Sequence, residues 1–219
     1  MGVLRGDIMR WGEKNRAPHR TFLEHAVLVS DIMVGLELSC RGDGRYRLLT
    51  EEDLDLPQAV CPNGSTVRWR VKLPHGPRIG VIPDRTFALK PTDPTDETST
   101  AYFFLEADRG TMPVKRSNLT QTSFFRKILA YQATWAQRIH TSQLGFHRFR
   151  VLAVTTSDER AGAVGSVCDE LKGGSGLFIV TELPQREHRG QSLLDLLSAT
   201  TRPVETTSSV PIDSPGTIG

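Results

Sequence analysis

The sequence predicts an α/β protein with a mixed central sheet flanked by helices, and three observations support this prediction. Residues 66–107 hold three strand-like segments divided by turn formers. Residues 115–145 carry bulky apolar side chains at helical spacing. Residues 149–181 run strand, helix, strand, a passage that usually forms a parallel crossover. The predicted order is a helix, a three-stranded antiparallel meander, a helix, a strand, a helix and a strand.

The first helix is predicted over residues 21–38. Thr21 can cap it, and Glu24 three residues later completes a capping box. Residues 1–19 are polar, rich in Arg and Gly and without clear periodicity, so we expect a flexible lead-in. Residues 41–64 hold an acidic run and turn formers, which predicts mostly loop with a short helix or strand. The apolar face of the helix is made of Phe22, Leu23, Ala26, Val27, Ile32, Met33 and Leu36.

The meander is predicted over residues 66–73, 79–90 and 101–107. Its first strand alternates apolar and basic residues, the period-2 pattern of a half-exposed strand. The Pro-His-Gly-Pro turn at 74–77 and the polar loop at 92–100 separate the three segments. Three consecutive strands joined in this way most simply pair as antiparallel neighbours.

The second half of the chain completes a core domain that we place at residues 20–183. The helix predicted over residues 115–145 has a packing stripe made of Phe124, Phe125, Ile128, Trp135 and Ile139. A buried strand at 149–156, a helix at 158–172 and a last strand at 176–181 follow. Residues 184–219 are expected to form a polar tail that is disordered, because the end of the chain from Thr200 is rich in Ser, Thr and Pro.

The charge of the chain is segregated. The formal net charge is +2, yet residues 109–157 contain no Asp or Glu and eight Lys or Arg. Without those eight, 19 basic residues (27 − 8) face 25 acidic ones, a balance of −6. Such a basic segment indicates a polyanionic partner, DNA above all. The alternative is a solvated basic helix face with no ligand.

The cysteines and the hydropathy indicate a cytoplasmic protein. Cys40, Cys61 and Cys168 are far apart and lack the spacing of a metal site, which is typical of reduced thiols. No apolar run suits a signal peptide or a membrane span, so we expect no membrane association.

Carboxylates lie at the ends of two neighbouring predicted strands. Asp84 follows Pro83 in the second strand, and Glu106 and Asp108 close the third. Carboxylates at strand ends beside a basic helix suit a hard cation such as Mg²⁺ near a phosphate. The alternatives are that Asp84 is a strand-end residue after proline, and that Glu106 and Asp108 cap Arg109 or the next helix.

These motifs, in this order, resemble known proteins. Pro83-Asp84 followed by Glu106-Ala107-Asp108 resembles the core of the PD-(D/E)XK nuclease-like superfamily. The wider set is more closely similar to the replication-relaxation family, over roughly residues 20–183. That set comprises His25, Ser30-Asp31, Pro83-Asp84, the run Phe103–Thr111 and Lys127 with Tyr131. The resemblance implies a restriction-endonuclease-like core and a role in plasmid replication initiation or mobilisation.

The nuclease resemblance also implies a chemistry. Asp84 and Glu106 would bind Mg²⁺, which polarises the scissile phosphate and lowers the pKa of the attacking water. The lysine that normally follows the glutamate by two positions is replaced by Asp108, which would add a metal ligand but remove a cation from the transition state.

Two cations could replace that lysine. Arg109 is adjacent, but strand alternation sends it to the opposite face. Lys127 lies on the next helix with Tyr131 one turn further on, so Lys127 is the better catalytic candidate. A solvated base and a packed aromatic residue are the alternatives for this pair. His25 is expected to be a packing residue, whereas Asp31, or less well Glu24, could extend the acidic cluster.

Three functions remain open at this stage. The first is a DNA-associated accessory protein of plasmid replication or mobilisation, which would work with other proteins of those processes. The second is a Mg²⁺-dependent nickase or endonuclease with Asp84, Glu106, Asp108 and Lys127 in its site. The third is a non-catalytic protein–protein adaptor. The expected DNA contacts are Arg109, Arg116, Arg126, Lys127, Tyr131 and Arg138.

Overall fold

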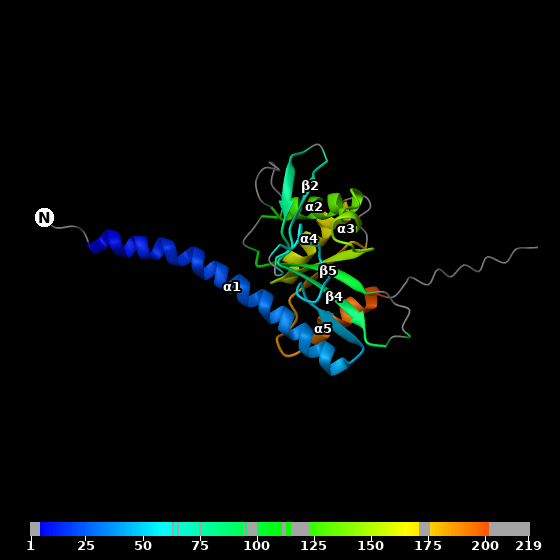
Figure 1. Ribbon diagram of the computed structural model, residues 1–219. Coiled ribbons are helices and arrows are strands. Elements are labelled where there is room, and N and C mark those ends of the chain that lie inside the picture. The colour runs from blue at the N-terminus through cyan, green and yellow to red at the C-terminus, as the bar shows by residue number, and fades with distance from the viewer. Residues whose placement is uncertain are drawn as a thin grey trace, which may run out of the picture.

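A computed structural model describes the chain from residue 5 to residue 201, except for residues 63, 65, 75, 94, 96–99, 111–112, 115–122 and 171–175. Side chains are described from Phe22 to Thr200. A central sheet lies between two helical layers, and one long helix, α1, extends beyond the body of the protein (Figure 1). The predicted α/β class with a mixed sheet flanked by helices is confirmed.

The main sheet has five strands in the order β1-β4-β5-β6-β7. The first three strands pair antiparallel, and β5, β6 and β7 pair parallel. The parallel crossover predicted over 149–181 is confirmed, with α4 (Asp158–Glu170) as its helix. The strands are β1 (Tyr46–Leu49), β4 (Arg85–Pro91), β5 (Ala101–Asp108), β6 (Phe149–Thr155) and β7 (Phe178–Glu182).

The predicted meander is wrong in its pairing. Its first strand, β2 (Trp69–Lys72), pairs with β3 (Arg78–Val81) in a separate two-stranded sheet, and β1 takes its place beside β4. The segment predicted as one strand at 79–90 divides into β3 and β4. The division falls at Pro83, whose nitrogen has no hydrogen to donate to a strand ladder.

One face of the sheet is covered by the two ends of the described chain, α1 (Arg5–Asp43) and α5 (Arg189–Thr201). Their side chains share one core with β4 and β5, which includes Ile32, Leu36, Phe87, Leu105, Leu193 and Leu197. Two expectations are corrected here. The first helix begins at Arg5 rather than Thr21, so residues 5–19 are helical. The supposed tail over 184–219 contains α5, whose leucines at 193, 194 and 197 are fully buried.

The opposite face is covered by α2 (Phe124–Ala136), α4 and the β2–β3 hairpin. The helix predicted over 115–145 is shorter than expected: it begins after the Ser123 cap and ends at Ala136, and residues 115–122 lie outside the described part. Arg138 then adopts a left-handed conformation (φ 54°) and starts a short helix, α3 (Ile139–Ser142). Trp135, expected in the packing stripe, is 41% exposed and stacks on His140.

Helix α1 is apolar on two opposite sides. Val29, Ile32, Leu36 and Cys40 face the core, whereas Leu23, Val27, Val34 and Leu38 are exposed. No helix in the described part of the chain meets the length and hydropathy that crossing a membrane requires.

The crossing of α1 and α5 rests on a glycine pair. A Cβ added at Gly190 would lie 2.0 Å from the carbonyl oxygen of Gly35 and 2.5 Å from Oγ of Ser39. An ion pair between Arg189 and Asp31 adjoins this contact. The two backbones are therefore too close for any side chain at position 190.

Replacing Gly190 with alanine is expected to lower the free energy of unfolding by about 3 kcal/mol, since the added methyl group must push two helix backbones apart. Gly165→Ala is the matched control, because nothing lies within 4 Å of a Cβ at that position in α4. Its free energy of unfolding should rise by roughly 0.5–1 kcal/mol, from helix propensity alone. Urea unfolding measures both, and equal effects would contradict the close crossing.

Candidate functional site

Strand β5 directs two acidic side chains to one side of the sheet. Phe103, Leu105 and Ala107 belong to the core beneath α1 and α5. Phe104 packs on the opposite side, and Glu106 and Asp108 follow it at two-residue intervals. Their partners lie on α2 and α4, as strand alternation requires. Glu106 and Asp108 therefore share the helix-covered face of the sheet.

Glu106 is the centre of the site and is only 2% exposed. Its Oε1 accepts a hydrogen bond from the Tyr131 hydroxyl at 2.6 Å, and its Oε2 accepts one from Nζ of Lys127. These two partners are four residues apart on α2, so one helix face supplies both donors. The carboxylate thus receives a counter-charge and a second hydrogen bond, which a buried carboxylate requires.

Burial governs the titration of this cluster. Burial raises the pKa of Glu106, and the nearby Asp84 charge acts in the same direction, while Lys127 and Tyr131 oppose it. Burial alone would lower the pKa of Lys127, but the charges of Glu106 and Asp84 outweigh it and the pKa is raised. Burial also raises the pKa of Tyr131, so the phenol remains a neutral donor.

Asp84 lies beside Glu106 at the start of β4. The pairing of Arg85 with Leu105, continued by one position, brings Asp84 opposite Glu106. Oδ2 of Asp84 accepts a hydrogen bond from the Ala107 backbone N–H at 2.8 Å, and Oδ1 lies 3.0 Å from Nε2 of His25. His25, expected to be only a packing residue, therefore connects α1 to this carboxylate.

Asp108 faces α4 rather than the other two carboxylates. Its Oδ2 lies 2.5 Å from Nε of Arg160, and its Oδ1 accepts the Gly110 backbone N–H at 3.1 Å. Arg160 was not identified from the sequence. The topology could have indicated this residue, because β5 and β6 are parallel and their carboxyl ends share one edge of the sheet. Helix α4 begins at that edge, just after β6.

The two acidic residues of α1 considered from the sequence, Glu24 and Asp31, pair elsewhere. Glu24 pairs with Arg109, and Asp31 pairs with Arg189 of α5. Arg109 thus lies on the opposite side of β5 from Glu106, which confirms the expectation from strand alternation. Of the two cations considered for the missing lysine position, Lys127 is the one that contacts Glu106.

The three carboxylates do not fit a Mg²⁺ site in this arrangement. Both oxygens of Glu106 and both oxygens of Asp108 are already hydrogen-bonded within the protein. Within the described ranges, no three His, Cys, Asp or Glu side chains are grouped so that they could hold a metal ion. A divalent ion at Glu106 would compete with the Lys127 ammonium for Oε2.

The residues expected to contact DNA differ in how far they are exposed and engaged. Tyr131 is 1% exposed and cannot stack on a base, and Lys127 and Arg109 are engaged with Glu106 and Glu24. Arg126 is half-buried on α2, and Arg138 is exposed after it. Arg116 lies outside the described residues.

Replacing Lys127 with methionine tests the balance of charge around Glu106. The variant should lose about 3 kcal/mol of unfolding free energy at pH 7, because it leaves a buried carboxylate without a counter-charge. Since burial already raises the Glu106 pKa above 4.5, that carboxylate takes up a proton as the pH falls. The loss should therefore be greatest at neutral pH and shrink toward pH 5.

Urea unfolding at both pH values measures this loss. The double variant K127M/E106Q serves as control and should recover most of the stability, because it removes both charges together. A loss that is the same at pH 5 and pH 7, or that the double variant does not repair, would contradict the balance of charge.

The model of the replication-relaxation family matches residues 6–148, which include α1, the β2–β3 hairpin, Asp84, Glu106, Asp108 and α2. No curated protein and no solved structure matches the chain. Because the family model matches well over half of its residues, this chain belongs to the replication-relaxation family.

Proposed function

We propose that this protein is a DNA-associated accessory factor of plasmid replication initiation or mobilisation that binds DNA without cutting it. Membership of the replication-relaxation family supports the process. DNA or other replication proteins are the partners expected in this process. The proposal includes a restriction-endonuclease-like core whose former catalytic positions have become structural.

The sheet supports the proposed ancestry. In a PD-(D/E)XK core, an aspartate and a glutamate stand on adjacent antiparallel strands, and here Asp84 and Glu106 stand at opposed positions of β4 and β5. A parallel strand follows beside β5, and a helix carrying Lys127 covers the site. This arrangement agrees with the order of motifs in the sequence.

The observation that carries the proposal is that all three carboxylates are engaged by basic side chains within the protein. Each of the three carboxylates has a basic partner from a different part of the chain: Asp84 has His25, Glu106 has Lys127, and Asp108 has Arg160. A nuclease needs carboxylate oxygens that are open to a divalent ion and through it to phosphate. Here the same oxygens hold α1, α2 and α4 against the sheet.

A Mg²⁺-dependent nickase is the second candidate, and the position of Lys127 favours it. Its ammonium lies against Glu106, where a nuclease needs a cation near the attacking water. On this alternative, Lys127 moves from Glu106 toward the reacting phosphate when metal enters. Cleavage of DNA therefore distinguishes the two candidates.

The decisive experiment incubates purified protein with supercoiled plasmid in Mg²⁺, in Mn²⁺ or in EDTA. We expect the plasmid to stay supercoiled in all three, because the carboxylates are engaged, while its gel mobility shifts with bound protein. The shift should weaken as salt rises, since phosphate contacts release counterions.

The matched control for cleavage is D84N/E106Q, which keeps the shape of both side chains. Metal-dependent nicking by the natural protein that vanishes in this variant would establish the nickase and overturn our proposal. The absence of both nicking and a salt-sensitive shift would leave the adaptor hypothesis in place of DNA binding.

A further inference from the structure

The β2–β3 hairpin presents a basic face. Its residues belong neither to the carboxylate site nor to the DNA contacts expected from the sequence. Along β2 and at the residue just before it, Arg68, Arg70 and Lys72 are exposed and alternate with buried Trp69 and Val71. On β3, Arg78 is exposed and stands opposite Lys72. Continuing the register by one position brings Arg68 opposite Ile82. Four cations thus lie on one side of a two-stranded ribbon.

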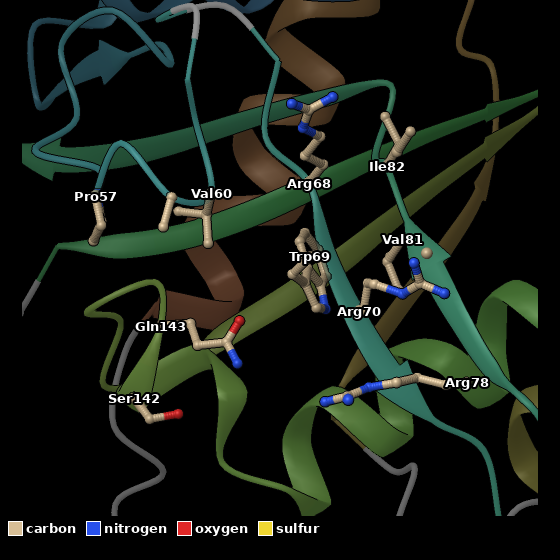
Figure 2. A pocket seen from close by; sticks show the side chains of 12 residues that line it. Pro57, Val60, Arg68, Trp69, Arg70, Arg78, Val81, Ile82, Ser142 and Gln143 are labelled. Carbon is tan, nitrogen blue, oxygen red and sulfur yellow. The ribbon is translucent and has the colours of Figure 1, made fainter.

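Among the residues that the structure describes, these four cations have no counter-charges. None of the four side chains makes an ion pair or a hydrogen bond with another described residue. Arg68, Arg70 and Arg78 line an open pocket of about 740 Å³. Its twelve lining residues include no Asp or Glu. Figure 2 shows the three arginines spread over the two strands, with Ser142 and Gln143 across the pocket from them.

The hairpin is held firmly on its other side. Nε1 of Trp69 donates a hydrogen bond to Oγ1 of Thr134 on α2 at 2.8 Å, and the Trp69 ring packs on Phe104 with centroids 5.0 Å apart. Nε2 of Gln137 donates to the carbonyl oxygen of Lys72 at 2.7 Å. The cations are therefore displayed on a fixed backbone, which limits the entropy lost when they bind a ligand.

The shape of the face indicates duplex DNA. Alternate residues of a strand are about 6.6 Å apart, so the three cations of β2 form a row that can follow successive phosphates of a backbone. A two-stranded ribbon also fits the width of a major groove. Among the described residues of the hairpin, the one aromatic ring, Trp69, is buried, so the face lacks the stacking platform of single-strand binders.

We infer that the exposed face of the β2–β3 hairpin, formed by Arg68, Arg70, Lys72 and Arg78, is the surface that contacts the phosphate backbone of duplex DNA. This inference rests on the proposed function. It replaces the contacts expected from the sequence with a surface whose cations have no ion-pair partner in the described part of the chain. Ser142 and Gln143 add neutral hydrogen-bonding groups at the pocket edge.

The test compares the natural protein with R70Q/R78Q in fluorescence anisotropy, using a labelled duplex in a series of salt concentrations. Removing two phosphate contacts should lower the slope of log affinity against log salt by about 1.8. Between 50 and 200 mM salt, the natural protein should lose about 12-fold more affinity than the variant does. K90Q/R148Q is the matched control, because it removes two exposed cations elsewhere and should keep the natural slope.

Each outcome bears on a different claim. If the natural protein shows no salt-dependent affinity for duplex, the proposed function fails. If it binds and R70Q/R78Q keeps its slope while its circular dichroism and melting temperature are unchanged, the hairpin inference fails. Should a single strand of the same length bind more tightly than the duplex, the inference of a duplex ligand is overturned. A slope that is reduced in R70Q/R78Q and unchanged in K90Q/R148Q supports the hairpin inference.

Discussion

The buried carboxylate of Glu106 is the constraint to which the rest of the structure is fitted. A charge at the centre of a sheet must be compensated, and α2 supplies both compensating groups, Lys127 and Tyr131. The same Tyr131 ring packs against Phe104 and Trp69, so α2 also carries the β2–β3 hairpin. The orientation of the basic hairpin face thus depends, through one helix, on how Glu106 is satisfied.

The remaining two acidic positions fasten other elements to the same strand. His25 joins α1 to Asp84, and Arg160 joins α4 to Asp108. A set of carboxylates on adjacent strands therefore works as attachment points for three helices. On the proposed function, these attachments give a reason for a constellation that resembles a nuclease site to persist, because losing one of these acids would weaken the hold on a helix.

Local patterns in the sequence predicted local structure well, and distant pairings poorly. The alternation at 66–73 predicted both a strand and its basic exposed side, and the four-residue spacing of Lys127 and Tyr131 predicted a shared helix face. A short helix or strand was expected within residues 41–64, but the pairing of β1 with β4 was missed, because four residues with no long alternation acquire their partner only in the folded sheet. The contacts of His25 and Arg160 were not predicted for the same reason, because their partners lie 59 and 52 residues away along the chain.

Because α1 and α5 meet at Gly35 and Gly190, the core between them cannot be completed until both helices have been synthesised. Helix α1 is the first described element to leave the ribosome, and α5, which completes the core beneath it, is the last. The apolar side of α1 around Ile32 and Leu36 therefore lacks the leucines of α5 until nearly the whole chain has been synthesised. A nascent chain that stops before residue 190 contains every strand of the main sheet but lacks the leucines of α5 that complete this core.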